Sequence, residues 1–147
     1  MIHVTKNKHI AFARIGDLQI IVYADRPRIS NDDLREFVQA ASKNYALAGP
    51  ITAVLVYSRG TRLNSLQRSL LTDAAKAINL PIAANAVITN SLIMRSTIAI
   101  MSWVLNIRIG GFPPTKVSEA LAWLAKYCSF SCAAAELAID QLLAAVY

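Results

Sequence analysis

Apolar and polar positions follow two different periods along this chain, and segments with each period alternate. His9–Ile15 and Leu18–Ala24 are β-type runs on either side of Gly16-Asp17, where glycine readily supplies the positive φ of a tight hairpin turn. Asn31–Ala48 instead keeps an apolar period near 3.6 residues, which is typical of a helix. The chain is therefore expected to open with a β-hairpin that leads into a helix.

The stretch Ile51–Leu71 organises the rest of the predicted fold. Its first part, Ile51–Tyr57, is apolar at almost every position, which is typical of a strand covered on both faces in the middle of a sheet. After a polar turn, Asn64 and Gln67 have the spacing of a capping box. A second helix, with Leu66 on its buried face, is expected to begin there.

The second half of the chain continues this alternation of strands and helices. The spacing predicts a single α/β domain over residues 1–147, with a core at about 9–128 and an added C-terminal helix. It also predicts a mixed, largely parallel sheet of four to five strands with helices packed on it. The remaining elements expected are a strand at 82–89, a helix at 91–105, a strand at 107–109, a turn at 110–114, and helices at 115–128 and 131–146.

The helix expected at 91–105 is apolar nearly all round, with only a narrow polar stripe. Such a helix must be covered on nearly every side. It either lies between the sheet and the C-terminal helices or forms a homodimer face, because a domain of this size rarely encloses a helix fully. The candidate dimer-interface residues are Ile93, Ile100, Trp103 and Val104.

Charge is scarce in this chain. Hydrophobic residues make up 55% and charged residues 16% of the sequence, against roughly 25% charged residues in typical soluble domains. This shortage favours a buried oligomer or partner interface. The net charge of +6 would suit an anionic partner. The arginines are nevertheless scattered, with no basic stripe carrying interleaved aromatic residues, so no nucleic-acid partner is expected.

Targeting and membrane signals are not visible in the sequence. The N-terminal MIHVTKNKHI has no apolar segment behind its charges, so it does not resemble a signal peptide. The most apolar segment, Ser91–Ile109, is interrupted by Arg95 and Arg108 and is too short in uninterrupted form to span a bilayer. A cytoplasmic protein without a membrane span is expected.

Catalytic and metal-binding patterns are nearly absent. The sequence has no G-x-S-x-G elbow, no glycine-rich phosphate loop with a lysine and no dinucleotide fingerprint. His3 and His9 have no Cys or acidic neighbour at ligand spacing. We therefore expect no enzymatic activity, no metal site and no cofactor.

The arginine-rich loop that leads into the second helix is the segment best suited to carry a regulatory phosphate. If Asn64 is the N-cap, Ser65 lies in the first helical turn, where a phosphate would meet the positive end of the helix dipole and nearby arginines. The alternative is an ordinary helix start, in which serine is common. The candidate residues for partner binding or phosphorylation are Ser65, Asn64, Arg59, Arg62 and Arg68.

The element order around Asn64-Ser65-Leu66 resembles the STAS fold of anti-sigma factor antagonists over about residues 9–128. In that family the buried strand ends in a D-S-S-G-L motif whose serine or threonine is phosphorylated by a partner kinase. Ser65 is the position that the resemblance carries over. The segment FPPTKVSEALAWLAK is similar to the matching segment of STAS-like bacterial proteins related to the sporulation antagonist.

The resemblance implies a non-enzymatic regulatory or scaffolding module, homodimeric in our interpretation. Its partner would be a protein of unknown identity, with a kinase or other signalling protein as a candidate, bound through residues 58–68 and the following helix. The alternative is a binder of a small apolar or anionic ligand, which the excess of hydrophobic residues in the helix at 91–105 and in the C-terminal helix suggests.

Overall fold

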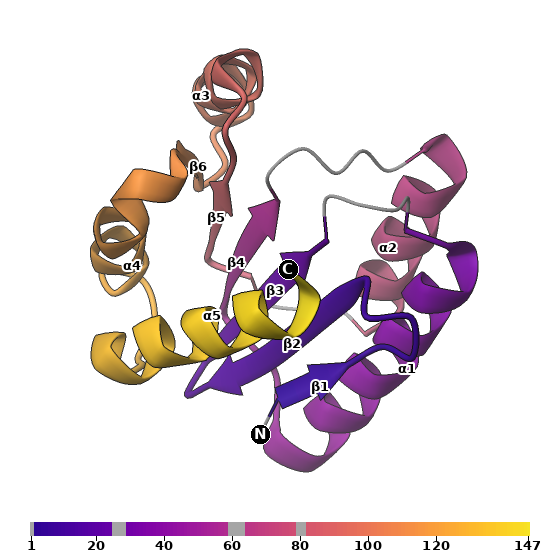
Figure 1. The fold of residues 1–147 in the computed structure, drawn as a ribbon. Helices are drawn as coiled ribbons and strands as arrows, with labels where there is room; N and C mark the ends of the chain where they lie inside the picture. The colour runs from indigo at the N-terminus through magenta and orange to yellow at the C-terminus, as the bar shows by residue number, and fades with distance from the viewer. Residues whose placement is uncertain (1, 25–28, 59–63, 79–81) are drawn as a thin grey trace.

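One mixed sheet runs through the centre of the molecule (Figure 1). The computed structural model describes residues 2–24, 29–58, 64–78 and 82–147. Within these ranges the sheet has six strands, whose order across the sheet follows their order in the chain. The first three strands pair antiparallel, and the last three extend the sheet in parallel. The strands are β1 (Ile2–Val4), β2 (Ile10–Ile15), β3 (Leu18–Tyr23), β4 (Ala53–Ser58), β5 (Ala84–Ile88) and β6 (Ile109–Phe112).

This sheet confirms the predicted mixed α/β class and the opening hairpin, but it has one strand more than expected. The additional strand is β1, in which Ile2 lies opposite Ala13 of β2. Three residues are too few to show a period of two, and the side chains of β1 are only half-buried. Pairing with β2, rather than a local pattern, defines this strand.

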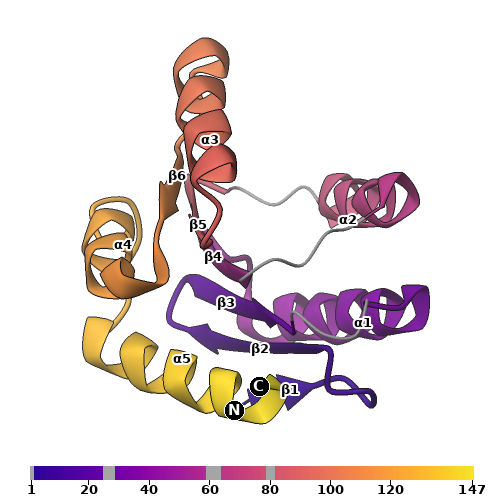
Figure 2. The ribbon, with the colours of Figure 1, turned by 45° about the horizontal axis from the view of Figure 1, so that its top comes forward.

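Helices lie on both faces of the sheet (Figure 2). Helices α4 and α5 cover one face, whereas α1 covers the opposite face over β2 and β3, and α2 packs against α1. Helix α3 lies beyond β6, away from the other helices. The helices are α1 (Asn31–Ala48), α2 (Ser65–Ile78), α3 (Leu92–Leu105), the 3-10 turn η1 (Pro114–Lys116), α4 (Val117–Leu124) and α5 (Cys132–Val146).

The two faces of the sheet are covered to different extents. Along β4 the side chains alternate, so that Leu55 and Tyr57 are buried towards α4 and α5 while Val54 and Val56 are only half-buried on the other face. The expected position of this strand in the middle of the sheet is confirmed, whereas the expected cover on both faces is only partly met, because one face is half-buried. The reason is that α2 packs against α1 rather than on β4.

The segment expected to turn at 110–114 belongs partly to β6. Gly110 and Gly111 continue the strand to Phe112, and the chain turns only afterwards. A Cβ atom on Gly111 would lie 3.2 Å from the Cα atom of Arg95, because the backbone of α3 approaches the strand at this point. Glycine here permits close helix-to-strand packing, which a local pattern of Gly and Pro does not reveal.

Candidate functional site

The first turn of α2 is closed by two reciprocal hydrogen bonds. The backbone amide of Gln67 donates to Oδ1 of Asn64 at 2.8 Å, and the backbone amide of Asn64 donates to Oε1 of Gln67 at 3.1 Å. These bonds form the capping box that the sequence predicts. They satisfy two backbone donors that have no partner within the helix, so α2 begins at Ser65.

Gln67 also fixes this turn to the start of α1. Its side chain is buried, and its Nε2 donates to the backbone oxygen of Ile29 at 2.7 Å and to Oδ1 of Asn31 at 3.2 Å. The expectation that Leu66 lies on the buried face of α2 is wrong, since Leu66 is 58% exposed. The periodicity of apolar residues could not identify Gln67 as the buried residue of this turn, because Gln67 is polar and its partners lie at the start of α1.

Ser65 lies on the solvent side of this turn. It is exposed, and its Oγ accepts a hydrogen bond from Nη2 of Arg68 at 3.2 Å. The hydroxyl therefore lies beside a guanidinium at the positive end of a helix. The structure thus brings together Asn64, Ser65 and Arg68, while Arg59 and Arg62 lie outside the described residues.

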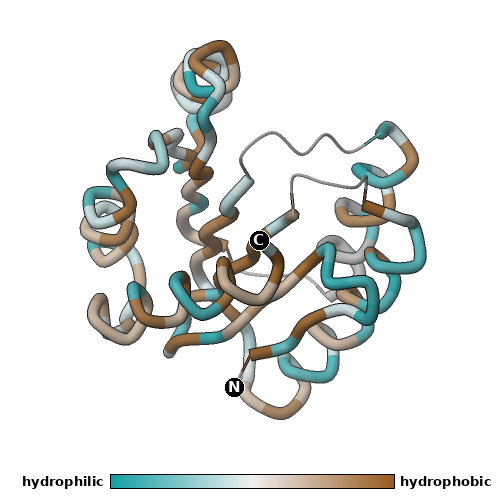
Figure 3. Tube along the Cα trace, in the orientation of Figure 1, coloured by the Kyte–Doolittle hydropathy of each residue, from teal (hydrophilic) through white to brown (hydrophobic). Residues whose placement is uncertain are grey.

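Helix α3 carries the second group of predicted site residues. Ile93, Ile100 and Val104 are 81%, 64% and 70% exposed, and their spacing of i, i+7 and i+11 places them on one stripe of the helix. Figure 3 shows hydrophobic residues in the central strands and again in this helix, with polar residues in the segment between them. The alternative of a helix enclosed between the sheet and the C-terminal helices is wrong, because this stripe is exposed. The side chain of Trp103 lies outside the described residues.

The opposite side of α3 holds it to the sheet. Ile98 is buried, and the guanidinium of Arg95 donates through Nη1 to the backbone oxygen of Thr89 at 2.8 Å. Ser91 caps the helix by accepting from the backbone amide of Met94 at 3.1 Å. The orientation of α3 is therefore fixed by its attachment, and its exposed stripe faces away from the chain.

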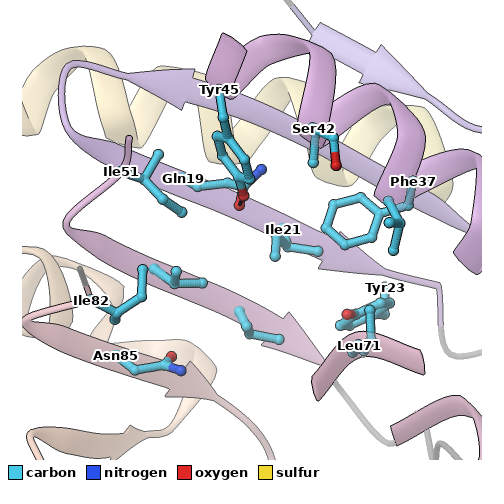
Figure 4. A pocket seen from close by; sticks show the side chains of 14 residues that line it. Gln19, Ile21, Tyr23, Phe37, Ser42, Tyr45, Ile51, Leu71, Ile82 and Asn85 are labelled. Carbon is cyan, nitrogen blue, oxygen red and sulfur yellow. Dashed lines mark hydrogen bonds between the residues drawn. The ribbon is translucent and has the colours of Figure 1, made fainter. Parts of the chain in front are cut away.

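A cavity of about 270 Å³ lies between α1 and the neighbouring part of the sheet (Figure 4). It is not beneath α3 or α5, where the hydrophobic excess of the sequence suggested a ligand site. Its walls come from segments that are far apart in the chain. Its described lining residues are Gln19, Ile21, Tyr23, Phe37, Val38, Ala41, Ser42, Tyr45, Ile51, Val54, Val56, Leu71, Ile82 and Asn85.

A buried carboxylate joins the turn between β1 and β2 to the start of α1. Oδ2 of Asp33 lies 2.6 Å from Nδ1 of His9 and accepts from Oγ of Ser30 at 2.8 Å. Burial alone would raise the pKa of Asp33, but hydrogen bonds from Ser30, His9, Thr5 and Asn7 lower that pKa below its usual value. Since Ser30 is also the N-cap of α1, this cluster stabilises the fold.

Neither a metal-binding cluster nor a membrane-spanning helix is found among the described residues. No group of three or more His, Cys, Asp or Glu side chains is placed there to hold a metal ion. No helix in the same ranges is both long enough and apolar enough to cross a membrane.

The arrangement of sheet and helices is that of a STAS-like domain. It is similar to the crystal structure of an uncharacterized protein of the DUF3478 family, with a SpoIIAA-like fold, from Shewanella loihica PV-4. The match has a TM-score of 0.56 and 16% sequence identity, and it covers 78% of this chain and 91% of that chain. At this identity the likeness concerns the fold alone. No protein-family model and no curated protein matches the sequence.

Proposed function

We propose that this chain is a regulatory protein-interaction module whose partner binds the start of α2. The observation that carries the proposal is the contact between the exposed Oγ of Ser65 and the guanidinium of Arg68, at 3.2 Å, on a helix start that Gln67 anchors. The STAS-like fold supports this assignment, because it places a rigid helix start at the C-terminal edge of the parallel strands.

A phosphate on Ser65 would change this surface in a defined way. It would add a charge of about −1.5 to −2 beside the guanidinium of Arg68 and the first backbone amides of α2. Both features attract an anion. The modified helix start would keep its fold while reversing the charge that a partner meets, which is the behaviour expected of a switchable binding site.

Self-association through α3 is the second part of the proposal. The stripe of Ile93, Ile100 and Val104 is apolar and exposed, and Arg95 is the only charged residue between Leu92 and Leu105. The guanidinium of Arg95 turns towards Thr89, on the attached side of the helix. A second copy of the same face fits this surface best. In a twofold dimer each residue near the axis meets the same residue of the partner, and the stripe carries no charge that would be repelled in this way.

The experiment compares proteins recovered by affinity purification from the source cells with wild type, Ser65→Asp and the control Ser69→Asp. Ser69 is also exposed, one turn further along α2. We expect a defined partner to be lost by about tenfold or more with Ser65→Asp, because a charged contact is reversed, and to be retained with Ser69→Asp. Equal recovery of every protein with all three forms would reject the start of α2 as the binding surface.

A further inference from the structure

The cavity between α1 and the sheet has an organised wall. Gln19 of β3, Val54 of β4 and Asn85 of β5 are register partners, so they form one row across three strands. Ile21 and Val56 form the neighbouring row on the same face. The first row carries two carboxamides, and the second is entirely apolar. The floor of the cavity is therefore polar at the row of Gln19 and Asn85 and apolar at the next row, beyond which the phenol side chain of Tyr23 also lines the cavity.

The roof of the cavity completes this division. Tyr45 of α1 donates its hydroxyl to Oε1 of Gln19 at 2.6 Å, above the polar row. Phe37 of α1 and Leu71 of α2 line the apolar part. Figure 4 shows Tyr45 and Asn85 on opposite sides of the cavity, with Ile21 of β3 between them.

One polar atom in this wall has no partner. Oδ1 of Asn85 is buried and accepts no hydrogen bond from the described residues. Leaving such an acceptor unpaired is unfavourable, so buried polar atoms nearly always have a partner. In the same row, the side-chain oxygen of Gln19 is paired with Tyr45. The open acceptor therefore marks the polar end of the cavity as incomplete.

The central strands beside the cavity are also incompletely covered. Val54 and Val56 are half-buried although β4 lies between two other strands, and among the described side chains of α2 only Leu71 lines the cavity. None of the 14 described lining residues carries a formal charge. A charged group placed here would lose its hydration without gaining a counter-ion, which is strongly unfavourable.

The geometry points to a binding site for an uncharged, mostly hydrocarbon small molecule with one hydrogen-bond donor, such as a hydroxyl group. The donor binds Oδ1 of Asn85 once the carboxamide has rotated towards the cavity, because this oxygen is inaccessible to water in the ligand-free structure. The hydrocarbon part lies along Ile21 and Val56 towards Leu71. The cavity volume of about 270 Å³ suits a ligand somewhat smaller than a typical drug molecule. This site is separate from the partner surface proposed at Ser65, and either can fail without the other.

The test uses three straight-chain probes with the unmodified protein: 1-octanol, its methyl ether 1-methoxyoctane, which lacks the donor, and octanoate, which is charged. Binding is followed by titration in two-dimensional amide NMR spectra, including the side-chain amides of Gln19 and Asn85. We expect saturable shifts with 1-octanol, affinity about fivefold lower for the ether because one hydrogen bond is lost, and affinity more than tenfold lower for octanoate. Absence of saturable binding by 1-octanol, or equal affinity for all three probes, overturns the proposal.

Two matched variants locate the site. Val56→Phe fills the cavity, whereas Val87→Phe places the same side chain at the register partner of Val56, which does not line it. We expect 1-octanol affinity to fall at least tenfold in the first variant and to stay within twofold in the second. Equal effects overturn the location. If Val56→Phe does not fold, Asn85→Leu tests the location of the site. We expect Asn85→Leu to bind 1-octanol and the ether with equal affinity. A preference for 1-octanol that persists in this variant contradicts the assignment.

Discussion

The side-chain amide of Gln67, on the first turn of α2, donates to the backbone oxygen of Ile29 at 2.7 Å. Ile29 immediately precedes Ser30, the N-cap of α1, so this bond links the starts of two helices. The same side chain closes the capping box with Asn64. Gln67 is therefore the residue that positions the candidate site around Ser65 relative to α1.

Replacing Gln67 by Ala should destabilise the protein by about 2 kcal/mol, because a cap is lost and a buried carbonyl group loses its donor. Leu66→Ala, at an exposed neighbouring position, should stay within about 0.5 kcal/mol of wild type. Urea unfolding followed by circular dichroism measures both values. A larger loss for Leu66→Ala than for Gln67→Ala would show that the apolar face, rather than the glutamine, fixes α2.

The carboxylate of Asp33 should make stability depend on pH in the acid range. Its pKa in the folded protein is lowered, so the folded state binds the proton less well than the unfolded state does. The stabilisation is therefore present above the unfolded pKa of about 4 and is lost as pH falls through the lower folded value.

Urea unfolding at a series of pH values between about 2 and 6 tests this dependence, with Asp33→Asn as the comparison. Asn cannot ionise, so this variant should be less stable near neutral pH and should lose less stability on acidification. Asp32→Asn is the matched control, because Asp32 is an exposed neighbour on the same helix turn. A wild-type acid dependence that survives Asp33→Asn unchanged would assign the titration to other groups.

Local signals allowed much of the fold to be predicted. Ser30 and Asp33 predict the start of α1, and Asn64 and Gln67 predict the start of α2, because each pattern is completed within four residues. Gly16 adopts a φ of 58° in the predicted hairpin turn. The parallel order of the later strands follows from their alternation with helices.

The parts that could not be predicted depend on contacts between distant residues. β1 exists through its pairing with β2, and Gly111 lies in a strand because the backbone of Arg95 approaches it. The row of Gln19, Val54 and Asn85 is assembled from three strands, so no motif announces it. The candidate site at Ser65 was visible because all its described members lie on one helix turn.

The exposed stripe of α3 predicts a dimer that specific charges should disrupt. The double variant Ile93→Glu and Ile100→Glu should weaken self-association more than about a hundredfold, because four glutamates would be desolvated at a twofold interface. Its monomer should still fold, since both side chains are exposed in the isolated chain.

Sedimentation equilibrium or native mass spectrometry measures the association. Leu137→Glu, at a residue of α5 that is 60% exposed, is the control and should remain dimeric. A monomeric wild type at the concentrations of an NMR sample, or a double variant as dimeric as wild type, would remove α3 as a self-association surface.

Replacing Asn85 or Gln19 by Leu should change the stability of the protein in opposite directions. Asn85→Leu removes a buried acceptor that has no partner and should raise the free energy of unfolding of the ligand-free protein by about 1 kcal/mol. Gln19→Leu leaves the hydroxyl of Tyr45 without its acceptor and should lower it by about 1–3 kcal/mol. Urea unfolding without added probe measures both. A polar residue that lowers the stability of the ligand-free protein is expected where binding, and not folding, requires it. If Asn85→Leu instead destabilises the protein as much as Gln19→Leu does, Asn85 serves the fold. The polar end of the cavity is then not kept for a ligand.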